Sequence, residues 1–351
     1  MIDYLGEERV LALLGLFGGV LLGLAARLGR FCTLGAIEDA LYAQDVTRLR
    51  MWGVAIGVAI VGSFGLAAAG LLQTERTIYL TFAFQPLASI IGGLMFGYGM
   101  AIAGNCGYGA LARLGGGDLR SFVIVMVMGL AAFATISGPL AYVRVAAFAQ
   151  EPAQSTVPGF AQGLSILTGL PVNGIGLGIG AAMLALTLMA PAFRAERGAI
   201  LWSICVGLAI VSGWAGTQWV ATAGFEPTIV ETHTFAAPLG ETMLYVMTAS
   251  GRSLTFGVGS VVGVLLGAFA GSLIKGHFRW EACEDPRELR RQIAGAALMG
   301  VGAVLAMGCS IGQGLSAISV LAYSAPLVMA GIFAGAWIGL RQLITGFARI
   351  A

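Results

Sequence analysis

Charged residues are scarce in this chain: aspartate, glutamate, lysine and arginine make up only 10% of it, while apolar residues make up 58%. So little polar surface cannot coat a soluble particle of 351 residues, which excludes the soluble globular classes. The apolar runs are continuous and about twenty residues long rather than short and alternating, which excludes a β-barrel and is typical of spanning helices. We therefore predict an all-α polytopic membrane protein.

Several functional motifs are also missing. The five cysteines are odd in number and show no paired spacing, which argues against a disulfide framework. His233 and His277 fall in loops far apart in the chain, so we expect neither a haem nor a metal site. No phosphate-binding loop and no basic cluster with aromatics appear, so we expect no cofactor and no nucleic acid. The N-terminus is acidic where a signal peptide is basic, which favours a retained first span.

The apolar runs predict nine spans in a single transmembrane domain over residues 1–351. Four spans form a first repeat over about 10–142, one span links the halves over about 171–191, and four more form a second repeat over about 199–345. Short re-entrant helices are expected where a polar gap precedes a stretch too short to cross a bilayer. The spans are predicted at roughly 10–28, 52–72, 86–104, 120–142, 171–191, 199–221, 254–274, 292–308 and 318–345.

The basic residues predict how these spans are oriented. Loops rich in lysine and arginine stay in the cytoplasm. The side that holds the N-terminus carries only Arg9, Arg76, Arg144 and Arg252. The opposite side carries Arg48, Arg50, Arg113, Arg120, Arg194, Arg197, Lys275, Arg279, Arg287, Arg290, Arg291, Arg341 and Arg349. We therefore predict an N-terminus outside and a C-terminus in the cytoplasm.

Two glycine-broken gaps suggest that the repeat is inverted. Residues 103–109 and 306–312 each place a cysteine between two apolar runs, and Cys106 and Cys309 lie 203 positions apart. On the predicted topology the third span runs inward before Cys106 and the eighth runs outward before Cys309. Inverted repeats of this kind have a pseudo-two-fold axis in the membrane plane, and transporters place substrate at the repeat interface. A third gap, residues 28–35, contains Cys32.

The chemistry of these gaps favours an anion with a soft sulfur end. A helix start presents unpaired N–H groups and a positive dipole end, which attract an anion. Neutral thiols add weak S–H donors and polarisable sulfur, so Cys32, Cys106 and Cys309 are the predicted contacts along one path. The path is expected to be narrowest between Cys106 and Cys309. The amides of Asn105 and Gln313 and the guanidinium of Arg30 are predicted second contacts.

Three motifs resemble those of the YeeE/YedE family of sulfur-transport membrane proteins. They are Gly-Arg-Phe-Cys-Thr-Leu-Gly at 29–35, Gly-Asn-Cys-Gly-Tyr-Gly at 104–109 and Gly-Cys-Ser-Ile-Gly-Gln-Gly at 308–314. The resemblance implies thiosulfate uptake across the bacterial inner membrane, with the ion relayed between thiols. It also implies a small cytoplasmic sulfur-carrier protein of the TusA type as a partner. Only Cys32, Cys106 and Cys309 fall in these motifs, and Cys205 and Cys283 lie outside them.

Two other functions use the same cysteines. A membrane thiol-disulfide or sulfurtransferase enzyme would need a resolving cysteine nearby in sequence or a thiolate beside a fixed base, and neither is evident. We therefore predict a transporter rather than an enzyme. A narrow channel for another small anion would share the architecture and differ only in the chemistry of its path. A polysulfide or a selenium analogue is also an open alternative to thiosulfate as the cargo.

Overall fold

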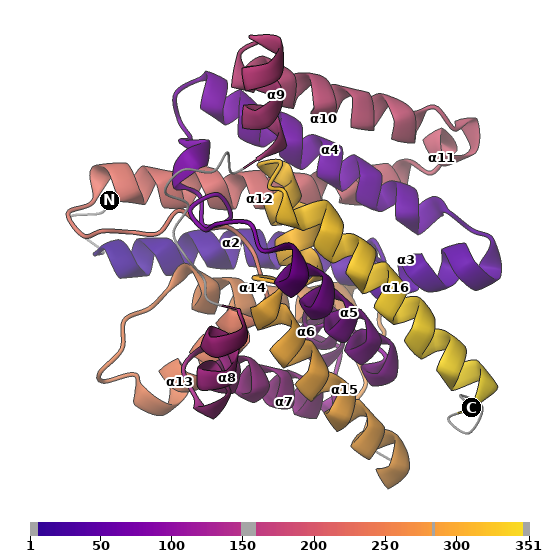
Figure 1. Ribbon diagram of the computed structural model, residues 1–351. Coiled ribbons are helices and arrows are strands. Elements are labelled where there is room, and N and C mark those ends of the chain that lie inside the picture. Colours follow the sequence, from indigo (N-terminus) through magenta and orange to yellow (C-terminus); the bar gives the residue numbers. More distant parts are fainter. Residues whose placement is uncertain (1–5, 149–158, 283–284, 347–351) are drawn as a thin grey trace.

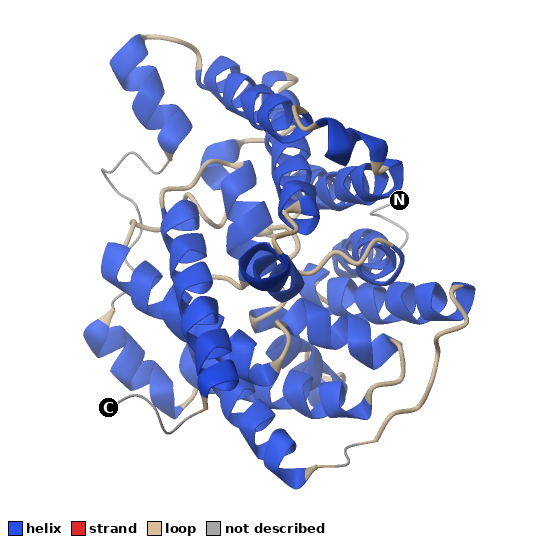
Figure 2. Ribbon diagram, turned by 90° about the vertical axis from the view of Figure 1, so that its right-hand side faces the viewer, coloured by secondary structure: helices blue, strands red, loops and turns tan. Residues whose placement is uncertain are grey.

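The computed structural model describes residues 6–148, 159–282 and 285–346, and within these ranges its regular elements are helices joined by loops (Figures 1 and 2). The predicted all-α membrane class is therefore confirmed. The first half contains α2 (Glu7–Leu28), α3 (Thr33–Glu38), α4 (Thr47–Ala68), α5 (Pro86–Ala103), α6 (Gly107–Gly115), α7 (Leu119–Ile136) and α8 (Pro139–Ala147). The second contains α9 (Phe160–Thr168), α10 (Val172–Leu188), α11 (Pro191–Ala195), α12 (Arg197–Ala223), α13 (Ala237–Thr248), α14 (Phe256–Ile274), α15 (Pro286–Leu305) and α16 (Ser324–Thr345).

In the described ranges, seven helical stretches are long and apolar enough to cross a membrane, and the bent pair α9 and α10 makes an eighth if it counts as one span. The two members of that pair meet at 116°. α15 does not qualify because Glu288, Arg290 and Arg291 lie in its first turns. The chain is thus a multi-pass membrane protein, and the count of nine spans stays a prediction.

Glycine rows bring α2 and α14 into close parallel contact. Gly15, Gly19 and Gly23 of α2 face Gly259, Gly263 and Gly267 of α14 in the same order along both helices. A side-chain carbon at Gly263 would lie only 2.9 Å from the Cα of Gly19. Lipid tails are as apolar as leucine, so the hydrophobic effect does not drive helices together inside a bilayer. Close van der Waals contact between backbones, which small residues allow, holds such helices together instead.

The centre of the molecule is built around α5 (Figure 1). α15 packs against it in the opposite direction: a methyl group added at Gly99 would lie only 2.5 Å from the carbonyl oxygen of Gly295, and one added at Gly302 only 2.6 Å from the nitrogen of Phe96. α16 packs on α5 in the same direction, and a methyl group added at Gly335 would lie 2.8 Å from the nitrogen of Tyr98. These close approaches place the ends of α5 and α15, and therefore Cys106 and Cys309, in the interior.

A second layer flanks this centre along α4. α10 packs on it in the opposite direction through Gly57 and Gly180, and α12 packs on it in the same direction through Gly207. In Figure 1, α9, α10 and α11 form the upper edge of the view, α7, α8 and α13 lie at the lower left, and α15 extends to the bottom. Thus α4 joins α10 to the rest of the bundle, while the start of α9 contacts the bundle directly, with the Phe160 amide donating to the Leu321 carbonyl at 2.8 Å.

Short helices follow each cysteine gap, as expected. Cys32 precedes α3, which continues into a π-helical turn over Asp39–Ala43. Cys106 precedes the nine-residue α6. A short helix also begins at Ser310, directly after Cys309, and contains the π-helical segment Gly312–Ala317. None of the three is long enough to cross a bilayer. The helix after Cys32 ends in exposed residues, with Leu41 and Tyr42 at the surface, whereas the segment Gly312–Ala317 after Cys309 is fully buried.

Candidate functional site

The three predicted thiols share one structural role, because each caps the start of the short helix that follows it. The sulfur of Cys32 accepts a hydrogen bond from the Gly35 amide at 3.5 Å, and that of Cys106 accepts one from Gly109 at 3.4 Å. An N-cap acceptor satisfies an amide that has no partner within its helix. These bonds use sulfur lone pairs and leave each S–H hydrogen to point elsewhere.

Cys309 has the most hydrogen-bond donors of the three. Its sulfur accepts from the Gly312 amide at 3.5 Å and also from the Phe235 amide at 3.3 Å, and the Thr234 hydroxyl lies 3.7 Å away. Only 1% of its surface is exposed. Tyr79 hydrogen-bonds Thr234 beside this sulfur, and burial, reinforced by Cys309, raises the pKa of the Tyr79 phenol well above its usual range. The phenol therefore stays protonated and remains a donor.

Cys106 interacts electrostatically with both of the other thiols. It is fully buried and within electrostatic range of both Cys32 and Cys309, and the Ser310 hydroxyl adjoins it. The backbone of Phe235 contacts both regions. Its amide donates a hydrogen bond to the Cys309 sulfur, and its carbonyl oxygen would lie 3.0 Å from a methyl group added at Gly107, the residue after Cys106. The Phe235 ring packs on Tyr108 with centroids 5.6 Å apart. Cys106 is thus a closely packed, fully buried thiol within electrostatic range of both others.

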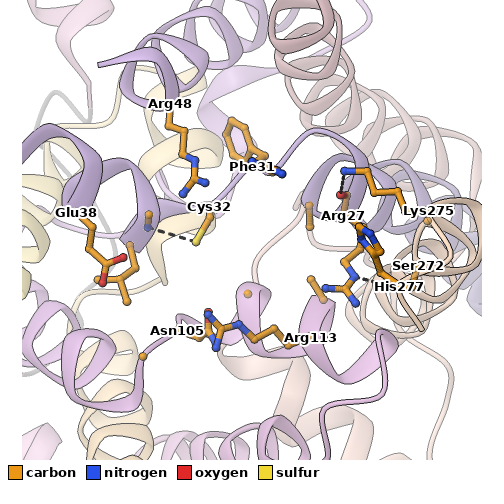
Figure 3. Close-up of a pocket in the computed structure, with 18 residues that line it drawn as sticks. Arg27, Phe31, Cys32, Glu38, Arg48, Asn105, Arg113, Ser272, Lys275 and His277 are labelled. Carbon is orange, nitrogen blue, oxygen red and sulfur yellow. Dashed lines mark hydrogen bonds between the residues drawn. The ribbon is translucent and has the colours of Figure 1, made fainter. Parts of the chain in front are cut away.

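Cys32 differs from the other two because it is only half-buried and opens onto a cavity of about 330 Å³ (Figure 3). Phe31 beside it is held by stacking on Trp52, with ring centroids 4.9 Å apart. We call this cavity the basic vestibule. Its polar and charged lining residues are Arg27, Arg30, Cys32, Glu38, Arg48, Asn105, Arg113, Ser272, Lys275 and His277.

The vestibule combines residues from four parts of the chain. Figure 3 shows Arg27, Arg48 and Arg113 around the open space with Cys32 facing it. Lys275, at the end of α14, donates to the carbonyls of Arg27 and Leu28 at 2.8 and 3.2 Å and so caps the C-terminus of α2. Burial lowers the pKa of Lys275, and the nearby positive charges of Arg30 and Arg27 lower it further. Positive charge is therefore concentrated here.

The structure brings Asn105 and Arg30 to the vestibule but gives Gln313 another environment. Asn105 is 3% exposed and Arg30, at φ 55, starts the turn into Cys32; both line the cavity. The Gln313 amide nitrogen donates to the carbonyls of Ala306 and Met307 at 2.7 and 3.2 Å. Both N–H groups of this amide are therefore bonded to carbonyls at the end of α15. To contact an ion, Gln313 would have to break one of these hydrogen bonds.

Several lining residues were not among the predicted site residues. His277, predicted only as a loop residue, lines the vestibule, and so do Arg113 and Lys275.

His233 is buried, with its Nδ1 2.6 Å from the Ser260 hydroxyl, and it does not line the vestibule. Across the described ranges no three histidine, cysteine or acidic residues are grouped as metal ligands. Cys205 is half-buried in α12, and Cys283 lies outside the described residues.

Comparison with known proteins gives a consistent result. The model of the Sulphur transport family matches residues 28–338. The thiosulfate transporter TsuA of Spirochaeta thermophila is 28% identical over 338 residues, which cover 92% of this chain and 96% of that protein. The thiosulfate transporter TsuA of Escherichia coli strain K12 is 26% identical over 359 residues, covering 95% and 91%. The matched range includes all three capping thiols.

Proposed function

Because the chain belongs to the Sulphur transport family, we propose that it takes up thiosulfate and relays the ion along Cys309, Cys106 and Cys32. The observation that carries this proposal is that Cys106 lies within electrostatic range of both other helix-capping thiols and that Cys32 opens into the basic vestibule. We call Cys309, Cys106 and Cys32 together the thiol row. Thiosulfate has a soft terminal sulfur and three hard oxygens. The thiols provide S–H donors for the first, and amides and hydroxyls beside them provide donors for the second.

The relay works because each contact is weak. At Cys309 the amides of Phe235 and Gly312 and the Thr234 hydroxyl surround the sulfur, so an arriving ion exchanges contacts with neutral groups. At Cys106 the ion would meet the thiol and the Ser310 hydroxyl, both of which are uncharged. An ion held by neutral donors is released more readily than one held by guanidinium groups, and serial weak sites are what conduction requires. Only at the vestibule does the ion meet full positive charges.

We further propose an inverted repeat with nine spans. Its support lies in equivalent helix pairs: α2 with α14 corresponds to α12 with α4, and α5 with α16 corresponds to α15 with α7. The pairs α5 with α15 and α2 with α12 each pack in opposite directions, as elements related by an in-plane axis do. With the N-terminus outside the bacterial inner membrane, Cys309 faces the periplasmic side and the vestibule faces the cytoplasm.

A small TusA-type sulfur-carrier protein is the proposed cytoplasmic partner of this chain. The segment after α14 is held against α7 because the Leu119 amide donates to the Glu281 carbonyl at 3.0 Å, and Arg120 pairs with Glu281 and Glu288 at 3.7 and 3.9 Å. This gives a fixed charged surface near the vestibule. Capture of a purified TusA-type protein should weaken in an Arg120→Glu variant; equal capture by both proteins would argue against this surface.

We propose a carrier without a catalytic step. The sulfurs of Cys32, Cys106 and Cys309 accept amide hydrogen bonds, and all three are free thiols. A sulfurtransferase would have to activate one of them as a thiolate beside a base. The donors around these sulfurs are amides and hydroxyls, which suit a contact that forms and breaks without bond exchange.

The test is uptake of labelled thiosulfate by cells that lack other sulfate and thiosulfate carriers. The wild-type chain should support uptake and growth on thiosulfate as sole sulfur source. Cys106→Ala should abolish uptake, whereas Cys32→Ala should only slow it because the vestibule offers other contacts. Cys205→Ala is the matched control, since Cys205 is a half-buried thiol outside the row. Wild-type cells that take up no more label than cells with an empty vector would exclude this function.

A further inference from the structure

The basic vestibule carries more positive charge than its own carboxylates neutralise. Five of its lining residues are cationic and one, Glu38, is acidic. Among the described residues only one of those cations makes an ion pair: Arg48 binds Asp39 at 3.1 Å. Arg27 donates to the neutral Ser272 hydroxyl at 2.6 Å, and Lys275 donates to backbone carbonyls. Within the described ranges Arg30 and Arg113 make no ion pair, and Glu38 is the carboxylate in electrostatic range of Arg113.

The unpaired cations are also held close together. The guanidinium of Arg27 packs directly over Gly116 at the end of α6, one turn beyond Arg113, and these two arginines lie close enough to repel each other. Glu281 and Asp118 offset this repulsion in part, and neither of them lines the cavity. The positive charges of Arg30 and Arg27 act on Lys275 in the same way. Like charges held near one another at a cavity are stabilised when an anion binds between them.

These groups differ in kind from the contacts along the thiol row. A guanidinium presents a planar fork of N–H donors that matches two oxygens of an oxyanion, which makes it a hard, charged site. The thiols prefer a soft sulfur end. A sulfate ion has the hard oxygens of thiosulfate and lacks its terminal sulfur, so it satisfies the arginines and gains nothing at the thiols.

We propose that the basic vestibule is a binding site for small, hard dianionic oxyanions such as sulfate, with Arg27 and Arg113 as its main ligands. An oxyanion bound there from the cytoplasm occupies the space that a transported ion must cross, so it inhibits uptake from the inside. Sulfate added outside meets only the thiol row and leaves uptake unchanged. The inhibition rests on the proposed function and orientation, whereas the binding does not.

Binding is tested by titrating the purified protein in detergent with sodium sulfate in a calorimeter, against sodium chloride at equal ionic strength. Arg113→Gln should weaken sulfate binding about tenfold, the loss expected for one charge-assisted contact at an open cavity, and Arg113→Lys should recover part of it. The matched control is Arg341→Gln, whose guanidinium lies over the Trp337 ring at 5.6 Å and does not line the vestibule. Absence of sulfate binding, or equal weakening by Arg341→Gln, would overturn the site.

Inhibition is tested in right-side-out membrane vesicles loaded with sulfate or with chloride. Internal sulfate should lower thiosulfate uptake severalfold in the wild type, and Arg113→Gln should relieve that inhibition. External sulfate at the same concentration should have little effect. Equal uptake with either internal salt, or inhibition from outside alone, would overturn the inhibitory role. Failure of chloride-loaded vesicles to take up thiosulfate would instead refute the proposed function, and the calorimetric result would still decide the site.

Discussion

Removing the Cys309 sulfur should destabilise the protein more than removing either of the other two thiols. In Cys309→Ala the Gly312 amide loses its cap, which costs about 1 kcal/mol. The Phe235 amide also loses its acceptor in a buried position, which costs about 1–3 kcal/mol more. Cys106→Ala loses the cap bond from Gly109 and the contact with the Ser310 hydroxyl, but strands no second backbone amide. Cys32 is half-buried, so water can replace its bond to the amide, and Cys32→Ala should cost least.

Serine separates this capping role from transport. Its hydroxyl is among the favoured N-cap acceptors, so Cys309→Ser should recover much of the stability that Cys309→Ala loses. The assay is the melting temperature of the detergent-solubilised protein, followed by tryptophan fluorescence, with Cys205→Ala as the control. A Cys309→Ala variant that melts with the wild type, or a serine variant that melts as low as the alanine variant, would refute the hydrogen-bonding argument.

Three further predictions concern packing, pH and orientation. Gly259→Ala would drive a methyl group into the Ala12 backbone and should cost about 1–3 kcal/mol, whereas Gly178→Ala, with open space around it, should not lower the melting temperature. Burial and the neighbouring Glu241 raise the pKa of Glu231 from 4.5 to about 8, so stability should fall as pH rises through that interval, and Glu231→Gln should flatten this dependence in thermal melts. A reporter fused after Ala351 should be cytoplasmic; a periplasmic signal would contradict the orientation.

The sequence predicted the membrane class and the cysteine gaps because both depend on local composition. Continuous apolar runs identify helices, and a cysteine beside a helix-breaking glycine identifies a helix start, as at Cys106. The glycine rows of α2 and α14 were visible as small-residue spacing, but their pairing was not, because it joins Gly19 to Gly263 across most of the chain.

The basic vestibule could not be predicted as a unit for the same reason. Lys275 reaches the end of α2, near Arg27, only through tertiary packing, and no sequence signal links His277 to Cys32. The environment of Gln313 was equally hidden, since an amide beside a cysteine gives the same pattern whether it faces an ion or the end of its own helix. The number of spans was harder to predict than their positions, because a helix such as α15 begins with charged residues and continues as an apolar run.

The central claim, that sulfur in the transported ion is recognised by sulfur in the protein, is tested most directly by labelled thiosulfate uptake in Cys106→Ser and Cys309→Ser. Serine keeps a hydroxyl donor and an N-cap acceptor at each position but removes the soft, polarisable sulfur. With expression matched and folding confirmed by melting temperature, both variants should take up far less thiosulfate than the wild type. Uptake at close to the wild-type rate in both would show that the thiols only cap and pack, and would contradict the relay.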